Sequence, residues 1–114
     1  MAVIVDCTDP QGLLDSIKQA INGGKVDTWI VDADGDFTHL PEQWRNLAWL
    51  RPKVAQGRLV FRILGPRGKG ISVVVYAVYH GRFIEMLLAH FDAKFSNVYA
   101  SAYPAEGDIV GAYS

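Results

Sequence analysis

The chain has 114 residues, of which 50% are hydrophobic, 20% charged and 11% aromatic, a balance that excludes disordered, collagen-like and low-complexity sequence. The formal net charge of −1 excludes an overall field that would draw the chain to nucleic acid or a membrane. Cys7 is the single cysteine, the N-terminus lacks a signal-peptide pattern and no apolar run could cross a bilayer, so we expect a reduced, cytoplasmic setting.

Periodicity and turn signals divide the chain into alternating strands and helices. Asp9 before Pro10 is a typical helix start, and Asp34-Gly35 between two apolar runs is typical of a hairpin turn. In chain order we predict a strand over 2–7, a helix over 10–22, strands over 26–33 and 36–40, a helix over 41–50, strands over 58–64 and 71–79, a helix over 80–95 and a strand over 97–103.

The order β-α-β-β-α-β-β-α-β predicts an α+β fold. We expect a single domain over residues 1–114, built as a two-layer sandwich of a mostly antiparallel sheet and about three helices. The run 71–79 is apolar on both faces, which favours a central strand. The tail over 104–114 is predicted to be loosely held, because it contains a proline and two glycines. The strand order stays open.

Charge is segregated along the chain. Residues 1–42 have a net charge of −6, residues 43–84 have eight bases and no acid, and residues 85–114 have a net charge of −3. One interpretation is mutual neutralisation across the sheet; the other is a basic surface for an acidic partner. The glycine-rich loop 65–70 would then present Arg67 and Lys69 at the tip of that surface. This interpretation requires that Arg51, Arg62, Arg67 and Lys69 emerge together on one face and are not each matched by an Asp or Glu.

The segment from Tyr79 to Glu85 is the second candidate binding site. Tyr79, His80, Arg82 and Glu85 place polar chemistry where the predicted strand 71–79 ends and the next helix begins. Helix N-termini attract anions, and strand ends commonly bind ligands. The alternative interpretation is structural, with helix capping and a surface ion pair from Arg82 to Glu85.

The strand that ends in Asp32-Ala33-Asp34-Gly35 resembles the first motif of the haloacid dehalogenase-like phosphohydrolases. The resemblance implies a magnesium-dependent phosphohydrolase in which Asp32 is the nucleophile and Asp34 the general acid and base. In that family Thr or Val follows the glycine, whereas this chain has Asp36. The alternative is a hairpin turn in which Asp34 and Gly35 adopt the required backbone conformation.

Three functional classes are compatible with these patterns. The one we favour is a non-enzymatic binding or interaction module with a basic face, such as a bacterial accessory or immunity-type protein, because no catalytic constellation is complete. The alternatives are a small phosphohydrolase-like enzyme using Asp32 and Asp34 and an oligomeric structural protein. We expect no cofactor and no metal. The expected partner is another protein or a second copy of the chain, with no membrane contact and no nucleic acid.

Overall fold

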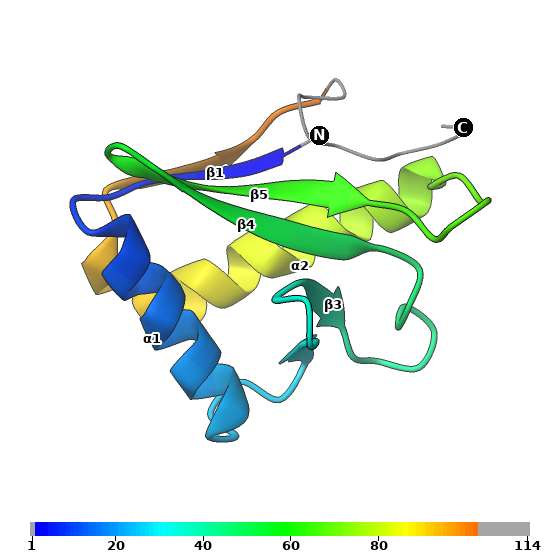
Figure 1. The fold of residues 1–114 in the computed structure, drawn as a ribbon, viewed down its shortest axis with the longest axis horizontal. Coiled ribbons are helices and arrows are strands. Elements are labelled where there is room, and N and C mark those ends of the chain that lie inside the picture. Colours follow the sequence, from blue (N-terminus) through cyan, green and yellow to red (C-terminus); the bar gives the residue numbers. More distant parts are fainter. Residues whose placement is uncertain (1, 103–114) are drawn as a thin grey trace.

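The computed structural model describes residues 2–102, which form an α+β fold (Figure 1). The predicted tail over 104–114 lies outside the described residues. In chain order the elements are β1 (Ala2–Asp6), α1 (Pro10–Asn22), β2 (Trp29–Val31), β3 (Phe37–His39), β4 (Trp49–Ala55), β5 (Arg58–Leu64), α2 (Val73–Phe91), a short 3-10 helix η1 (Asp92–Lys94) and β6 (Asn97–Ala100).

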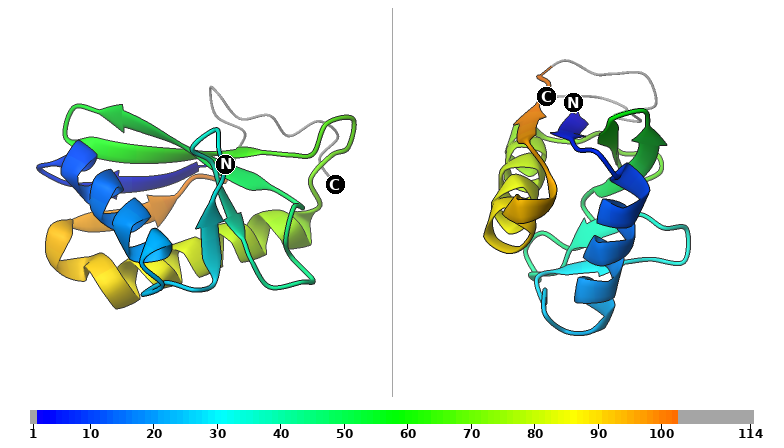
Figure 2. Two further views of the ribbon diagram at one scale, coloured as in Figure 1. Left: turned by 60° about the horizontal axis from the view of Figure 1, so that its bottom comes forward. Right: turned by 90° about the vertical axis from the view of Figure 1, so that its left-hand side faces the viewer.

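The six described strands form one sheet in the order β2-β3-β4-β5-β1-β6, and every neighbouring pair is antiparallel. Both helices lie on the same side of the sheet, as Figures 1 and 2 show. The predicted α+β class is therefore confirmed. The described residues contain two α-helices rather than about three.

The core lies between the two helices and the face of the sheet that they cover. Phe83 from α2 is at its centre, with ring centroids 4.5 Å from Phe61, 5.7 Å from Phe37 and 5.0 Å from Trp29. These rings come from β5, β3 and β2, and they meet Phe83 edge-on, an arrangement that aromatic pairs prefer. The sheet thus curves enough for strands at its centre and at its edge to contact one helix.

Helix α1 has the predicted bounds because its ends carry strong local signals. The Asp9 side chain accepts a hydrogen bond from the backbone N–H of Gly12 at 3.0 Å, and Pro10 occupies the first helical turn. The Gly23 N–H closes the other end on the carbonyl of Gln19. The apolar residues at helical spacing face the core: Leu13, Leu14, Ile17 and Ile21.

The hairpin turn at Asp34-Gly35 is also confirmed. Gly35 has φ of +82°, a backbone conformation that residues other than glycine rarely adopt. The two strands beside it pair antiparallel, with Val31 opposite Phe37. Both are three residues long, shorter than the predicted runs.

The predicted central strand over 71–79 is wrong, because this segment forms the first turns of α2. Ser72 caps the helix by accepting a hydrogen bond from the Val75 N–H at 3.1 Å. An unbroken apolar run has neither the period of a strand nor that of a helix, so the pattern alone cannot distinguish the two. In the helix, part of the run faces outward: Val73 is 48% exposed and Val74 61%.

The predicted helix over 41–50 is also wrong. The chain passes through consecutive turns there, and Asn46 has a positive φ of 62°, which an α-helix does not accommodate. Strand β4 then begins at Trp49 and continues through Pro52. Proline lacks the backbone N–H that a paired strand would use. It is tolerated here because β3 pairs with β4 only at Leu50, so no strand pairs with Pro52 on the side that faces β3.

Candidate functional site

The outer face of β4 and β5, away from the helices, is rich in basic side chains. Alternation along β5 buries Leu59, Phe61 and Ile63 completely on the inner face, which places Arg58 and Arg62 on the outer face. On β4 the buried Leu50 likewise places Arg51 and Lys53 outward. We call these four outward residues the basic face: Arg51, Lys53, Arg58 and Arg62.

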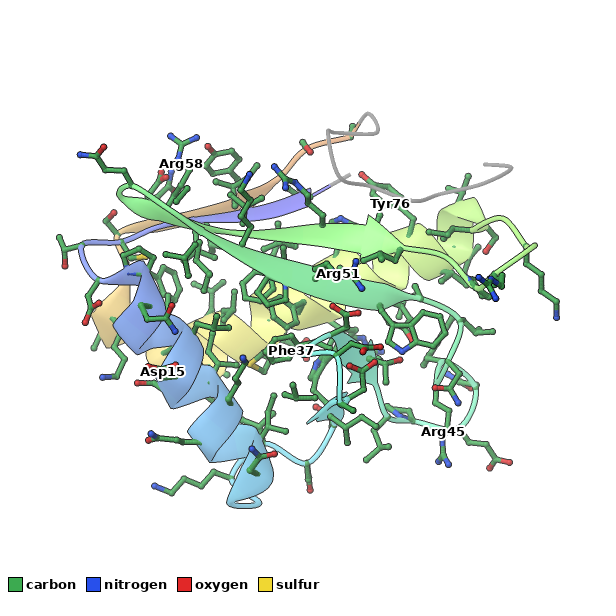
Figure 3. All side chains as sticks on the ribbon, viewed as in Figure 1. Asp15, Phe37, Arg45, Arg51, Arg58 and Tyr76 are labelled. Atoms are coloured by element: carbon green, nitrogen blue, oxygen red, sulfur yellow. The ribbon has the colours of Figure 1, made fainter. Side chains whose placement is uncertain are left out.

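The strand register brings two arginines of the basic face together. Arg51 lies directly opposite Arg62 across the β4–β5 pair. Facing residues on neighbouring strands have Cβ atoms roughly 4.5–5.5 Å apart, and like charges in this position repel. Figure 3 shows that Arg58 lies beside the β4–β5 turn, apart from Arg51 near the other end of the hairpin. The structure therefore concentrates positive charge that the sequence distributes over a longer segment.

Carboxylates neutralise part of the basic face. Asp36 accepts two hydrogen bonds from Arg51, from Nε at 2.9 Å and from Nη2 at 2.8 Å. These bonds to a carboxylate raise the pKa of Arg51. Asp6 lies 3.9 Å from Arg58, a longer and weaker contact. Arg62 forms no ion pair with another described residue, and its Nε is buried without a hydrogen-bond partner among them.

The loop between β5 and α2 carries Arg67 and Lys69 at one end of the molecule (Figure 1). Both side chains are exposed, and neither forms an ion pair with another described residue. Gly68 between them has φ of +74°, and the Lys69 N–H donates to the Pro66 carbonyl at 3.1 Å. The loop follows the end of β5 nearer to Arg62, so its charges extend the basic face without lying on the sheet.

The predicted cluster from Tyr79 to Glu85 does not lie at a junction of strand and helix, because all four residues are in the middle of α2. Tyr79 and His80 are buried, whereas Arg82 and Glu85 are exposed. The cluster is therefore divided between the core and the surface. No ion pair joins Arg82 to Glu85 within the described part of the chain.

Tyr79 holds the irregular segment before β4 against the core. Its hydroxyl donates to the Trp44 carbonyl and lies 3.0 Å from the Thr38 hydroxyl. Thr38 in turn donates to the Ala48 carbonyl at 3.0 Å. These bonds satisfy the carbonyls of Trp44 and Ala48, neither of which belongs to a helix or strand, so the role of Tyr79 here is structural.

Arg82 and Glu85 border a cleft of about 270 Å³ beside β2, which also includes Trp29, His39 and His90. His39 is buried, and its Nδ1 donates to the Thr28 carbonyl at 2.8 Å, which leaves Nε2 as an acceptor. His39 Nε2 and Trp29 Nε1, an acceptor and a donor, have no hydrogen-bond partner among the described residues. The sequence did not point to His39 and Trp29 as neighbours, because only the register of the β2–β3 hairpin places them opposite each other.

One carboxylate oxygen from each of three residues lies within 4.8 Å of the other two: Asp32, Asp34 and Asp36. Asp32 Oδ1 accepts hydrogen bonds from the N–H groups of Asp34 and Asp36, both at 2.9 Å, which shapes the turn. Both oxygens of Asp36 face the Arg51 guanidinium. This arrangement supports the turn interpretation, and phosphoryl hydrolysis stays a prediction.

Cys7 is buried, and burial together with the nearby Asp6 and Asp9 raises the pKa of its thiol, so it is not activated as a nucleophile. Over residues 2–102, neither helix combines the length and apolar character that crossing a bilayer requires. Comparisons of the chain with protein-family models, with curated proteins and with solved structures found no match.

Proposed function

We propose that this protein is a non-enzymatic binding module that holds an acidic segment of a partner protein against its basic face. The observation that carries the proposal is the placement of Arg51 directly opposite Arg62, where Asp36 neutralises only Arg51. Lys53 follows on the same face of β4 without an ion pair to any other described residue.

Electrostatics favours an external carboxylate at this place. Facing like charges destabilise a sheet, and a guanidinium N–H that is buried without an acceptor costs further free energy. A carboxylate from a partner would offset the repulsion between the two arginines, because the terminal N–H groups of a guanidinium form charge-assisted hydrogen bonds with a carboxylate. Arg67 and Lys69 in the neighbouring loop would extend the contact along an acidic segment.

The charge distribution favours a protein partner over nucleic acid. The chain has twelve acids against eleven bases, so beyond the basic face a polyanion would meet negative charge. A short acidic segment can follow the two strands and the loop without contacting the rest of the surface. The partner class proposed is therefore an acidic protein segment.

The test measures binding of a fluorescein-labelled poly-glutamate peptide by fluorescence anisotropy at low ionic strength. The wild-type protein should bind it, and added salt should weaken the complex because salt screens exposed charges. The double variant Lys53→Glu with Arg62→Glu should lose affinity by roughly tenfold or more, since two attractive contacts become repulsive.

A matched control is the double variant Lys18→Glu with Lys25→Glu, which makes the same change in net charge on and after α1, on the other side of the sheet. This variant should bind poly-glutamate within about twofold of wild type. Equal losses in the two variants, or no binding by wild type, would reject the proposal. Tighter binding of duplex DNA than of poly-glutamate would also reject the partner class.

A further inference from the structure

The cleft beside β2 has a floor whose polar atoms are not satisfied within the described part of the chain. Trp29 is 1% exposed and His39 is 2% exposed, and both border the cleft. Less than 1 Å² of Trp29 Nε1 and of His39 Nε2 is exposed, and neither nitrogen has a hydrogen-bond partner among the described residues. Buried polar atoms are normally paired, because an unpaired donor or acceptor costs free energy. The floor therefore favours a bound molecule that supplies the missing partners.

The two floor nitrogens require opposite partners. Trp29 Nε1 carries a hydrogen and can only donate. His39 Nδ1 donates to the Thr28 carbonyl at 2.8 Å, so Nε2 of the neutral imidazole carries a lone pair and accepts. The two residues lie opposite each other in the β2–β3 pair, with ring centroids 4.5 Å apart. A small group that offers an acceptor and a donor side by side would satisfy both nitrogens, and a carboxamide is such a group.

A carboxylate or an alkyl group of the same size would not satisfy the floor. An ionised carboxylate only accepts, so a carboxylate bonded to Trp29 Nε1 would direct its other oxygen at the lone pair of His39 Nε2. An alkyl group would leave both nitrogens unpaired. Burial lowers the pKa of His39 and so favours the neutral imidazole that carries this lone pair. The floor thus distinguishes a carboxamide from groups of the same shape.

Arg82 and Glu85 give the rim of the cleft charges of both signs. Both side chains are exposed, both border the cleft, and no ion pair joins them within the described residues. Both charges act on the imidazole of His39, so they lie near the floor. A free amino acid has an α-carboxylate and an α-ammonium group, which suit a guanidinium and a carboxylate respectively. The cleft volume of about 270 Å³ is below the roughly 300–1,000 Å³ of drug-sized sites, which also favours a small ligand.

The side chains around the floor are of types that can move aside for a ligand. Met86 also borders the cleft, and its unbranched thioether side chain adapts to different neighbours. Arg82 and Glu85 are long, exposed side chains with many rotamers. Changes of rotamer at these positions would uncover the two nitrogens without a change in the backbone.

We infer that this cleft binds a free amino acid with a carboxamide side chain, which is glutamine or asparagine. The carboxamide would lie on Trp29 and His39, and the α-carboxylate and α-ammonium groups would face Arg82 and Glu85. The inference does not depend on the proposed function, because the cleft lies on the helix side of the sheet and the basic face lies on the other side. Either kind of binding can fail while the other persists.

The first test is isothermal titration calorimetry of the full-length chain at neutral pH. Glutamine or asparagine should bind one-to-one. The corresponding carboxylate, glutamate or aspartate, should bind at least about tenfold more weakly, because it has the same shape but no donor for His39. Norleucine, which has neither a donor nor an acceptor in its side chain, should bind at least as weakly as the carboxylate.

Two variants separate the rim from the floor. Glu85→Gln removes a rim charge at an exposed residue and should weaken binding about fivefold or more. The matched control Glu42→Gln changes an exposed residue outside the cleft and should bind within about twofold of wild type. His39→Phe keeps a ring but removes the lone pair, so the preference for the carboxamide over the carboxylate should fall to about twofold or less. Circular dichroism checks that each variant is folded.

The second test is the indole N–H signal of Trp29 in a two-dimensional NMR spectrum, which reports the floor directly. The chain has three tryptophans and therefore three such signals. The bound amino acid should shift the signal of Trp29 and leave those of Trp44 and Trp49, which do not border the cleft. The variants Trp44→Phe and Trp49→Phe identify these two signals, and the third belongs to Trp29.

Three results would each overturn the inference. One is the absence of saturable binding by both glutamine and asparagine, which would leave ordered water as the partner of the two nitrogens. Another is equal affinity for the carboxamide and its carboxylate. The third is binding that leaves the Trp29 signal unmoved, because the ligand would then lie elsewhere on the chain.

Discussion

The two faces of the β4–β5 hairpin carry opposite chemistry on the same backbone. The inner face presents Leu59, Phe61 and Ile63, which are completely buried, and the outer face presents Arg58 and Arg62 at alternating positions. A shift of one residue in register would bury the arginines and expose the phenylalanine. Burial of the inner residues therefore fixes the register of the hairpin, and this register places the arginines on the outer face.

The two faces also differ in how their polar groups are satisfied. On the inner side, Thr38 and Tyr79 are buried and bonded to each other and to backbone carbonyls. On the outer side, Arg51 has a carboxylate partner and Arg62 has none among the described residues. Thr38 and Tyr79 thus support the fold, whereas Arg62 leaves a contact unfilled.

The largest effect should come from removing the inner aromatic ring of this hairpin. Phe61→Ala removes a ring that packs at 4.5 Å from Phe83 and 5.6 Å from Phe37. We expect a loss of about 3–5 kcal/mol in the free energy of unfolding, measured by urea denaturation. The neighbouring Val60→Ala, on the outer face, should cost less than about 1.5 kcal/mol. Equal costs would break the distinction between the faces.

A smaller loss should follow from Tyr79→Phe, which keeps the inner ring and removes only its hydroxyl. The Trp44 carbonyl would lose its donor and the Thr38 hydroxyl a neighbour, both in the core, so the expected cost is about 1–3 kcal/mol. Hydrogen exchange should also speed up at residues 44–48, which the hydroxyl holds. Tyr99→Phe, at a 41% exposed residue of edge strand β6, should change stability by less than about 0.5 kcal/mol.

Local signals in the sequence predicted the parts of the fold that local interactions determine. The Asp9 cap and Pro10 located α1, and Asp34-Gly35 located the hairpin turn, because each of these residues acts on its own neighbours. The run 71–79 failed because its character depends on what packs against it. Phe83 and Leu87 bind α2 to the sheet, and this distant contact selects the helix over the strand.

The candidate site was predictable in composition but not in arrangement. The excess of bases over residues 43–84 is visible in the sequence, whereas the pairing of Arg51 with Arg62 depends on the register of β4 with β5. The prediction of a helix over 41–50 hid that register, because it left no predicted strand where β4 lies. The ion pair between Asp36 and Arg51 likewise joins segments that only the folded sheet brings together.

Asp36 lies where the acidic hairpin meets the basic face, so Asp36→Asn tests the boundary between the two regions. The variant leaves Arg51 and Arg62 opposite each other without the carboxylate, and Arg51 is half exposed, so the stability loss should be about 0.5–1 kcal/mol. Poly-glutamate affinity should rise, because an internal competitor is removed. Asp34→Asn, in the same turn but without this ion pair, should leave the affinity closer to the wild-type value.

The smallest effect concerns His39, a base on the covered side of the sheet whose protonation the core opposes. Burial lowers the pKa of His39 below its ordinary value of 6.5; Arg82 lowers it further, while the Thr28 carbonyl and Glu85 act in the opposite direction. Well above 6.5 the imidazole is neutral in both the folded and the unfolded chain, and its contribution to stability is complete. As the pH falls through 6.5 the unfolded chain takes up a proton first, so stability is lost until the folded pKa is reached.

His39→Phe keeps a ring beside Trp29 and should flatten this part of the stability profile, measured by urea denaturation across the same pH range. The ring-proton resonances of wild-type His39 should titrate below 6.5, and titration at or above that value would show that the covered side tolerates a charge as readily as the basic face does.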